Sequence, residues 1–127
     1  MTDTPDSASR TVLSLLDACN RRDIETALSL FAEDAIYHNI PIAPARGIAA
    51  IREMLGPFLA MAEEVDWVVH HLVANDGVVM TERTDRFKLP SGWLELPVMG
   101  IFEVRAGRIA AWRDYFDMAP LRPIMGG

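Results

Sequence analysis

An arginine and an aspartate lie two residues apart, at Arg83 and Asp85, within the alternating segment 78–87. In an extended strand successive side chains point to opposite faces, so both charged groups share one face with Thr81 and Phe87. On a solvated face they would form an ordinary surface salt bridge. On a buried face they would need close partners and further hydrogen bonds, because removing charges from water is costly.

A second carboxylate, Asp114, shares a strand face with Trp112 and Phe116 near the end of the chain. The alternative is that the opposite face, which carries Arg113, points inward and that Asp114 is simply solvated. A guanidinium between two carboxylates can satisfy all three groups through its fork of donors. This favours an inward Asp114 as a second partner of Arg83.

Two acids beside one arginine cannot both be ionised without cost in a water-poor site, so one should keep its proton near neutral pH. That division supplies a general acid and a general base, which typically contribute about 10²- to 10⁴-fold per proton transfer without a metal or organic cofactor. Tyr37 and Asn39 share one face of another strand, where a hydroxyl and an amide could hold a water molecule beside the base. Taken singly, Tyr37 is more often a packing residue and Asn39 a turn residue.

The elements that position these side chains follow from the spacing of apolar residues. Helical spacing predicts helices at 9–19, 24–31 and 47–59, with Ser9 and Asp23 as caps of the first two. Runs rich in Val, Ile, Trp and Phe, separated by turn residues, predict strands at 35–40, 65–74, 78–89, 93–104 and 108–116. Helices followed by an antiparallel meander predict an α+β domain whose curved sheet wraps around the N-terminal helices.

Length and composition suit one domain, expected over 10–127 after a polar, disordered lead-in at 1–9. The net charge of −6 disfavours nucleic-acid binding. The single cysteine, Cys19, falls in an apolar helical pattern and is expected to be a buried structural thiol, and three scattered histidines with one cysteine make no metal site. No apolar run approaches the roughly 20 residues of a membrane span, so we expect a cytoplasmic protein with no membrane contact.

Several predicted strands are apolar on both faces, as in Leu94, Leu96 and Val98 against Met99 and Ile101. A lone sheet with one wet face should alternate more cleanly. We therefore expect another subunit to cover the outer face, in a homodimer.

Three segments resemble the signature segments of the limonene-1,2-epoxide hydrolase family, in the same order and at similar separations. They are Tyr37-His38-Asn39, Thr81-Glu82-Arg83-Thr84-Asp85 and Trp112-Arg113-Asp114-Tyr115-Phe116-Asp117. The resemblance spans about residues 10 to 120, and the three segments together are specific, whereas each alone would be weak. His38, between Tyr37 and Asn39, should point away from them by alternation.

The resemblance implies a cone in which a mostly antiparallel mixed sheet and several helices enclose a deep apolar pocket, usually in a homodimer, as in the wider nuclear-transport-factor-like superfamily. It implies a cofactor-independent epoxide hydrolase that adds water in one step to a small or medium-sized apolar epoxide and gives a vicinal diol. Asp114 would activate a water held by Tyr37 and Asn39, Asp85 would protonate the epoxide oxygen, and Arg83 would bridge the two aspartates. Expected pocket walls, at positions that are as often core as substrate contact, are Phe58, Phe87, Leu96, Val98, Trp112 and Phe116.

Two other functions fit the same cone. One is an isomerase or cyclase that moves protons on a bound ring, and the other is a non-catalytic binding module in which Arg83 and Asp85 form a structural salt bridge. An isomerase would not need a water-holding pair, and a binding module has little reason to keep all five polar residues together. The substrate's size and polarity stay open, partly because of the acidic residues Glu63, Glu64 and Asp66.

Overall fold

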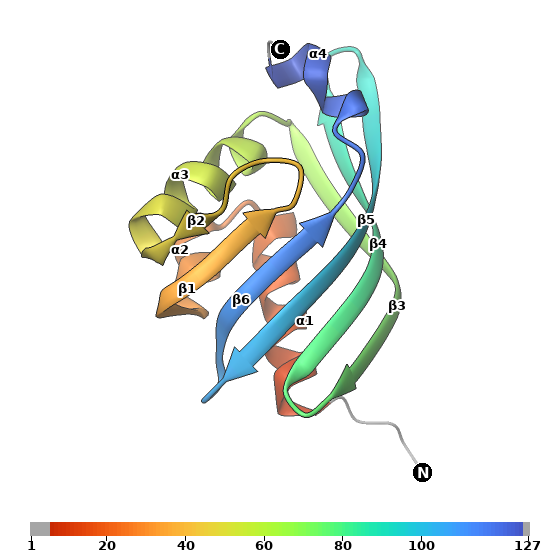
Figure 1. Cartoon of the computed structure of the whole chain (residues 1–127). Coiled ribbons are helices and arrows are strands. Elements are labelled where there is room, and N and C mark those ends of the chain that lie inside the picture. The colour runs from red at the N-terminus through yellow and green to blue at the C-terminus, as the bar shows by residue number, and fades with distance from the viewer. Residues whose placement is uncertain (1–5, 126–127) are drawn as a thin grey trace.

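Three helices cover one face of a curved, six-stranded sheet in the computed structural model, which describes residues 6–125 (Figure 1). The helices are α1 (Ser7–Asn20), α2 (Ile24–Ser29) and α3 (Gly47–Ala60). The strands are β1 (Phe31–Asn39), β2 (Ala45–Arg46), β3 (Glu64–Asn75), β4 (Val78–Leu89), β5 (Gly92–Arg105) and β6 (Arg108–Tyr115). A 3₁₀ turn η1 (Ala119–Leu121) and a short helix α4 (Arg122–Met125) follow.

The sheet has the order β2-β1-β6-β5-β4-β3, with β1 and β6 parallel and all other neighbours antiparallel. This confirms the expected α+β class with a mostly antiparallel mixed sheet. It also brings the first long strand of the chain beside the last one (Figure 1). No helix within residues 6–125 is long and apolar enough to cross a membrane.

The first helix starts earlier than its apolar pattern predicts. Asp6, not Ser9, is the N-cap, because its carboxylate accepts a hydrogen bond from the Ser9 backbone N–H at 2.7 Å. Residues 7–9 are therefore helical and do not belong to the lead-in, while residues 1–5 of that predicted segment lie outside the described residues. The second cap is as expected: the Asp23 side chain accepts from the Thr26 backbone N–H at 3.2 Å.

The first strand also starts earlier, at Phe31 and not at Ala35. The pairing of β1 with β6 shifts register between Phe31 and Ile36, and this irregularity takes up Glu33 and Asp34, which are exposed. Glu33 and Asp34, which precede the predicted strand, are therefore part of β1. Helix α2 ends at Ser29, so Phe31 contributes to the core from the sheet.

Two tight hairpins hold the long strands in register. Asp76 and Gly77 join β3 to β4, and Ala106 and Gly107 join β5 to β6, all four with positive φ between 51° and 79°. This pattern is the two-residue type I′ turn, whose twist matches that of the flanking strands. Because a slip of one residue would turn every side chain to the other face, these turns help to decide which side chains face the helices.

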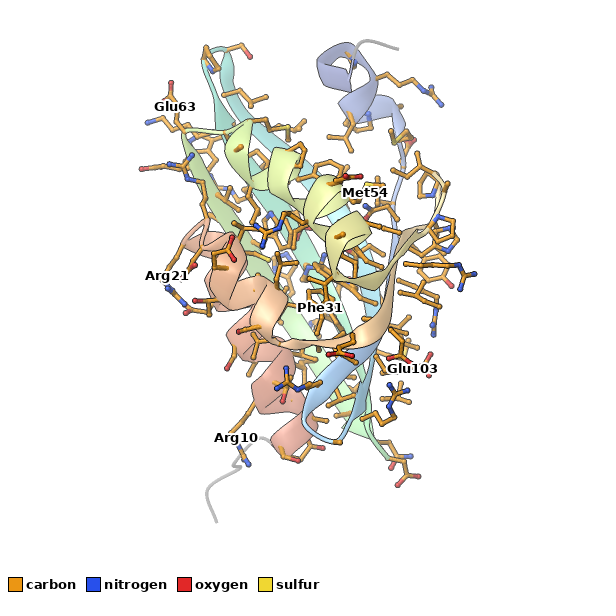
Figure 2. All side chains as sticks on the ribbon, turned by 90° about the vertical axis from the view of Figure 1, so that its left-hand side faces the viewer. Arg10, Arg21, Phe31, Met54, Glu63 and Glu103 are labelled. Atoms are coloured by element: carbon orange, nitrogen blue, oxygen red, sulfur yellow. The ribbon has the colours of Figure 1, made fainter. Side chains whose placement is uncertain are left out.

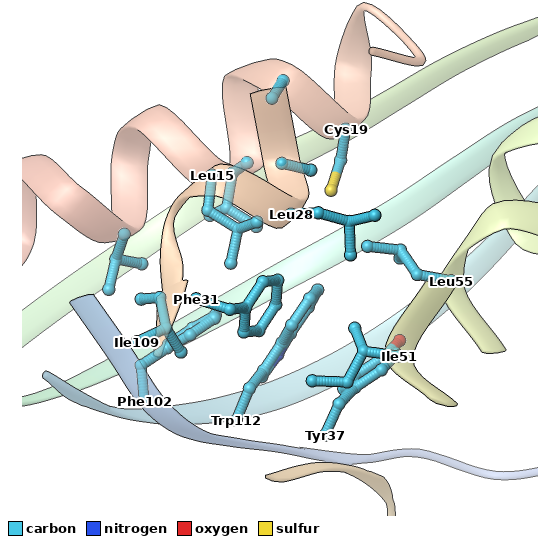
Figure 3. Close-up of a cluster of buried hydrophobic side chains, with 14 of the residues drawn as sticks. Leu15, Cys19, Leu28, Phe31, Tyr37, Ile51, Leu55, Phe102, Ile109 and Trp112 are labelled. Atoms are coloured by element: carbon cyan, nitrogen blue, oxygen red, sulfur yellow. The ribbon is translucent and has the colours of Figure 1, made fainter. Parts of the chain in front are cut away.

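The core lies between the helices and the sheet and centres on Trp112, which stacks on Tyr37 and Phe102 with ring centroids 4.3 and 5.2 Å away (Figure 3). Cys19 is fully buried in this core, and burial raises the pKa of its thiol, as expected for a structural cysteine. Charged side chains such as Arg21 and Glu63 extend outward from the helical side (Figure 2).

Candidate active site

The charged pair of β4 lies on the buried face of the sheet. Arg83 is 1% exposed and Asp85 is 4% exposed, and Asp114 of β6 is 3% exposed. The alternation along β4 buries Val79, Thr81, Arg83, Asp85 and Phe87, whereas Met80 and Glu82 are exposed. The inward reading of Asp114 is therefore correct, and Arg113 lies on the other face, where it donates to Glu103 at 2.7 Å.

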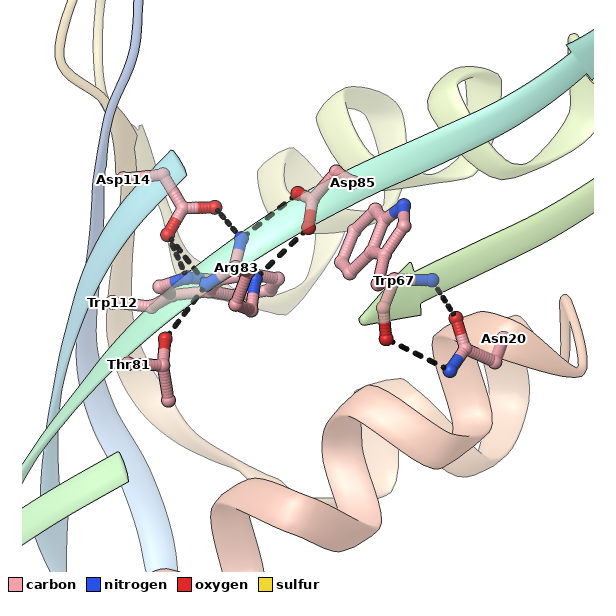
Figure 4. A network of polar contacts seen from close by, with 7 residues as sticks. All are labelled: Asn20, Trp67, Thr81, Arg83, Asp85, Trp112 and Asp114. Carbon is pink, nitrogen blue, oxygen red and sulfur yellow. Dashed lines mark hydrogen bonds and ion pairs between the residues drawn. The ribbon is translucent and has the colours of Figure 1, made fainter. Parts of the chain in front are cut away.

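Arg83 holds the two aspartates together (Figure 4). Its Nε and Nη2 donate to the two oxygens of Asp85, both at 2.9 Å, while Nη2 and Nη1 donate to the two oxygens of Asp114 at 2.9 and 3.2 Å. Nη1 also donates to Oγ1 of Thr81 at 3.1 Å. All five N–H donors of the guanidinium are thereby used, which compensates the removal of its charge from water.

Asp114 receives a third hydrogen bond, from Nε1 of Trp112 at 2.7 Å. Trp112 itself is fully buried and does not line the cavity, so its prediction as a pocket wall is wrong. The aromatic residues and helices packed over the strand enclose its ring, and only the indole N–H reaches the site. A carboxylate has about four lone-pair sites, so three donors leave Asp114 with one site free for a water molecule.

The two aspartates differ in their surroundings. Burial raises the pKa of Asp85 to about 6 against the opposing effect of Arg83, and the charge of Asp114 adds to the increase. Among residues 6–125, Asp85 accepts side-chain hydrogen bonds only from Arg83, whereas Asp114 accepts them from Arg83 and Trp112. The raised pKa of Asp85 suits it to the role of proton donor, because burial favours its neutral form.

Strand β1 brings Tyr37 and Asn39 to the same place. Parallel pairing sets Tyr37 beside Trp112 and Asn39 beside Asp114, and both side chains are buried. Burial, followed by the charge of Asp114, raises the pKa of the Tyr37 hydroxyl well above its usual value, so it stays neutral and can donate a hydrogen bond. His38 points elsewhere, with Nε2 2.9 Å from the carbonyl oxygen of Ile42.

One cavity opens onto this group of residues, with about 280 Å³ of empty space including its mouth. It is lined by Tyr37, Asn39, Phe58, Trp67, Asp85, Phe87, Leu96, Val98, Asp114, Phe116 and Leu121. Five of the six predicted walls lie on it, with Trp112 as the exception. Trp67 of β3 and Leu121 of η1 were not predicted, because neither falls in a polar motif or beside one.

Gly100 of β5 makes the contact between Arg83 and Asp114 possible. It lies between Thr81 and Asp114 in the sheet register. A Cβ atom there would lie 2.5 Å from Oδ1 of Asp114 and closer still to Nη1 of Arg83. A glycine in a strand interior signals such a close approach, but its partners become visible only with the register.

The acidic residues at 63–66 stay outside this cavity. Glu63 and Glu64 are exposed, and Asp66 pairs with Arg86 at 2.9 Å. Within residues 6–125 no cluster of three or more His, Cys, Asp or Glu side chains is arranged to hold a metal ion.

Comparison with known proteins places the chain in a family. The model of the limonene-1,2-epoxide hydrolase catalytic domain matches residues 6–123. Over 111 residues the chain is 34% identical to epoxide hydrolase EphG of Mycobacterium tuberculosis, covering 84% of this chain and 71% of EphG.

Two solved structures extend the comparison. An LEH-like epoxide hydrolase of M. tuberculosis superposes with a TM-score of 0.78 at 27% identity, over 95% of this chain and 97% of that one. A protein of Shewanella putrefaciens described as a SnoaL-like polyketide cyclase shares the fold, with a TM-score of 0.83 at 15% identity over 98% of both chains. From the family match and the identity to EphG, the chain belongs to the limonene-1,2-epoxide hydrolase family.

Proposed function

We propose that this protein is a cofactor-independent epoxide hydrolase that adds water in one step to a small or medium-sized, largely apolar epoxide to give a vicinal diol. The observation that carries the proposal is the Arg83 guanidinium bound to two buried carboxylates from different strands, both on one cavity. The family match and the similarity to EphG support the same reaction. Most of the side chains that line the cavity are apolar, which favours a largely apolar substrate.

In the proposed reaction, Asp114 takes a proton from a water molecule held by Tyr37 and Asn39. The water oxygen attacks one epoxide carbon, the bond from that carbon to the epoxide oxygen breaks, and the oxygen takes the proton of Asp85. A proton must then return from Asp114 to Asp85 before the next turnover. Attack and departure occur on opposite sides of one carbon, which suits two acids that come from different strands.

Unpaired polar atoms in the cavity support the water site. Nδ2 of Asn39 is buried and has no hydrogen-bond partner among the described residues. A buried donor without a partner is costly, so a bound water is a natural acceptor. Arg83 does not line the cavity, and its proposed role is to orient the aspartates and fix their charges.

Isosteric substitution tests these roles. Asp85→Asn and Asp114→Asn should each lower kcat by at least about 10²-fold, because each removes one proton transfer. Glu82→Gln is the matched control: it lies in the same strand with its side chain exposed on the opposite face, and it should keep wild-type turnover. Rapid turnover by either aspartate variant would remove that residue from the mechanism.

The route of the oxygen gives a second test. Single-turnover hydrolysis in heavy-oxygen water should label the diol and leave the protein unlabelled, and label in Asp85 or Asp114 would mean a covalent intermediate instead. A panel of cyclic and linear epoxides, assayed without added metal or cofactor, tests the activity itself. If no member gives a diol, an isomerase, a cyclase or a binding module becomes the better assignment.

We also propose that the protein is a homodimer in the cytoplasm that uses the outer face of the sheet. Met80, Met99 and Tyr115 are 42%, 46% and 48% exposed there, which is unusual for large apolar side chains on neighbouring strands. Met99→Lys should convert the dimer to a monomer in sedimentation equilibrium. A wild-type protein that sediments as a monomer at high concentration would contradict the proposal.

A further inference from the structure

Two buried side-chain nitrogens have no hydrogen-bond partner among the described residues, and both belong to residues that line the cavity. They are Nδ2 of Asn39 and Nε1 of Trp67. The Asn39 amide has a place in the proposed reaction beside the attacking water, but the indole N–H of Trp67 has none. Burying an N–H group without an acceptor costs about 1–3 kcal/mol, so an unpaired donor on a cavity points to a ligand.

The main chain of Trp67 is fixed from outside the cavity. It lies opposite Asp85 in the pairing of β3 with β4. The side chain of Asn20 accepts a hydrogen bond from its N–H at 2.6 Å and donates one to its carbonyl oxygen at 3.3 Å (Figure 4). The residue is therefore held at both of its backbone polar groups.

The indole ring is fixed as well. It packs edge-on against Phe87 and Trp112, with ring centroids 6.1 and 6.2 Å away, and Cζ of Arg83 lies 5.5 Å from its ring centroid. Trp67 is 4% exposed. Its N–H therefore has little freedom to turn toward another acceptor.

Asp85, which lies opposite Trp67 in the sheet, does not accept a hydrogen bond from this N–H. Both oxygens of Asp85 accept from Arg83, and neither is hydrogen-bonded to the indole. Tyr37, Asn39 and Asp114 also line the cavity, but none of them accepts a hydrogen bond from the indole. The other lining residues, such as Phe58, Phe87 and Leu96, carry no polar side-chain atoms. Because an indole N–H only donates, the missing partner is an acceptor that enters the cavity.

We propose that Nε1 of Trp67 donates a hydrogen bond to a second oxygen of the substrate, so that the preferred substrate is an epoxide bearing a hydroxyl, ether or carbonyl oxygen. This inference rests on the proposed hydrolase function. The epoxide oxygen must meet Asp85, and the attacked carbon must lie between Asp85 and Asp114. Figure 4 shows the indole nitrogen at the end of the ring farther from Arg83 and Asp114, so the acceptor it meets belongs to a substituent of the epoxide.

An unpaired donor at a cavity with largely apolar walls also sets a substrate preference. A site with a buried polar group rejects an analogue that leaves that group unpaired more strongly than a purely apolar site rejects a change of one methylene. The rest of the lining favours a hydrocarbon skeleton. The expected substrate is therefore mostly apolar, with one oxygen placed to reach Trp67.

Matched substrates test this directly. Cyclohexene oxides carrying a methoxy group at each ring position are compared with their ethyl analogues, which differ only by CH₂ in place of oxygen. The wild type should prefer one methoxy compound over its ethyl partner by about 5- to 150-fold in kcat/KM, the cost of an unpaired donor expressed as a rate ratio. Trp67→Phe keeps an aromatic ring in the same packing, and it should abolish this preference by lowering kcat/KM much more for the methoxy compound than for its ethyl partner.

A binding measurement separates this inference from the hydrolase proposal. In ¹⁵N-labelled protein the indole resonances of the three tryptophans are followed, and the spectrum of Trp67→Phe assigns that of Trp67. The methoxy diol should shift the Trp67 indole proton downfield, and the ethyl diol should not. If the shift is observed but no epoxide is hydrolysed, the proposed hydrogen bond of Trp67 stands and the hydrolase proposal is refuted.

Other results overturn the inference. Epoxide turnover without a methoxy preference, an equal loss for both substrates in Trp67→Phe, or an indole resonance that neither diol shifts would each mean that the N–H faces only water.

Discussion

Replacing Gly100 with alanine should disable the site without altering any of its polar residues. The new Cβ would lie 2.5 Å from Oδ1 of Asp114 and 3.2 Å from Oγ1 of Thr81, and closest of all to Nη1 of Arg83. Side-chain carbons essentially never approach other atoms within 3.0 Å. The carboxylate and the guanidinium must therefore retreat by about 0.5 Å or more, since fully packed interiors leave no free room.

The geometry gives the size of the effect. Nη1 donates to Asp114 at 3.2 Å and to Thr81 at 3.1 Å, both near the upper limit for an N–H···O hydrogen bond. A displacement of about 0.5 Å breaks both bonds. Disrupting a buried ion pair lowers the free energy of unfolding by about 3 kcal/mol, and misplacing reacting groups by up to about 1 Å lowers kcat on the order of 10²-fold.

The assay is epoxide hydrolysis together with urea denaturation, and Gly56→Ala is the matched control. Gly56 lies in α3, and outside its own helix no atom lies within 4 Å of the position its Cβ would take. That variant should keep wild-type turnover and be at least as stable as the wild type, because alanine favours a helix more than glycine does. A Gly100→Ala protein with wild-type kcat and unfolding free energy would refute the assignment of Gly100 as the residue that lets Arg83 reach Asp114.

Further predictions concern protonation and the orientation of Asp114. The pKa of Asp85 lies at about 6, so its acid form prevails below that pH. Above it, kcat/KM should fall about tenfold per pH unit. A flat profile of kcat/KM up to about pH 9 would exclude Asp85 as the proton donor. Its pKa is raised on folding from 3.8, so the folded state binds more protons between pH 4 and 6, and the free energy of unfolding should fall by up to about 3 kcal/mol as the pH rises through this interval. Urea titrations should show this slope in the wild type and not in Asp85→Asn, and equal slopes would contradict it. Trp112→Phe keeps an aromatic ring for stacking but removes the N–H donated to Asp114, so kcat should fall about tenfold with KM unchanged, while an unchanged kcat would mean that this hydrogen bond does not position the base.

Strand alternation made the main polar groups predictable from sequence. Arg83, Asp85 and Asp114 share their strand faces with large apolar residues, and a period of two leaves only two choices of face for each strand. The partnership between one guanidinium and two carboxylates selected the buried choice. The helix order and the hairpin turns followed from equally local signals, namely apolar spacing and Asn, Asp and Gly at turns.

The features of the site that could not be predicted from the sequence depend on packing between elements. Trp112 has the spacing of a pocket wall, but the rings stacked on both sides of it, Tyr37 and Phe102, make it a core residue. Trp67 lies in β3 shortly before a register shift between Val69 and His71. The shift interrupts the alternation of side chains, so the face of Trp67 could not be derived from the positions of the histidines that follow. Gly100 needed the register of three strands before its partners could be identified.

The parallel pairing of β1 with β6 has a consequence for how the protein becomes active. The three hairpin-linked strand pairs can form from residues close in sequence, but Asn39 meets Asp114 only when segments 75 residues apart along the chain come together. Such long-range pairing is slow to form, because the entropy of closing the loop is lost before the contacts are gained. During synthesis on the ribosome, the side of the cavity that Asn39 and Asp114 line cannot assemble until β6 has emerged, so most of the sheet can form before the cavity is complete.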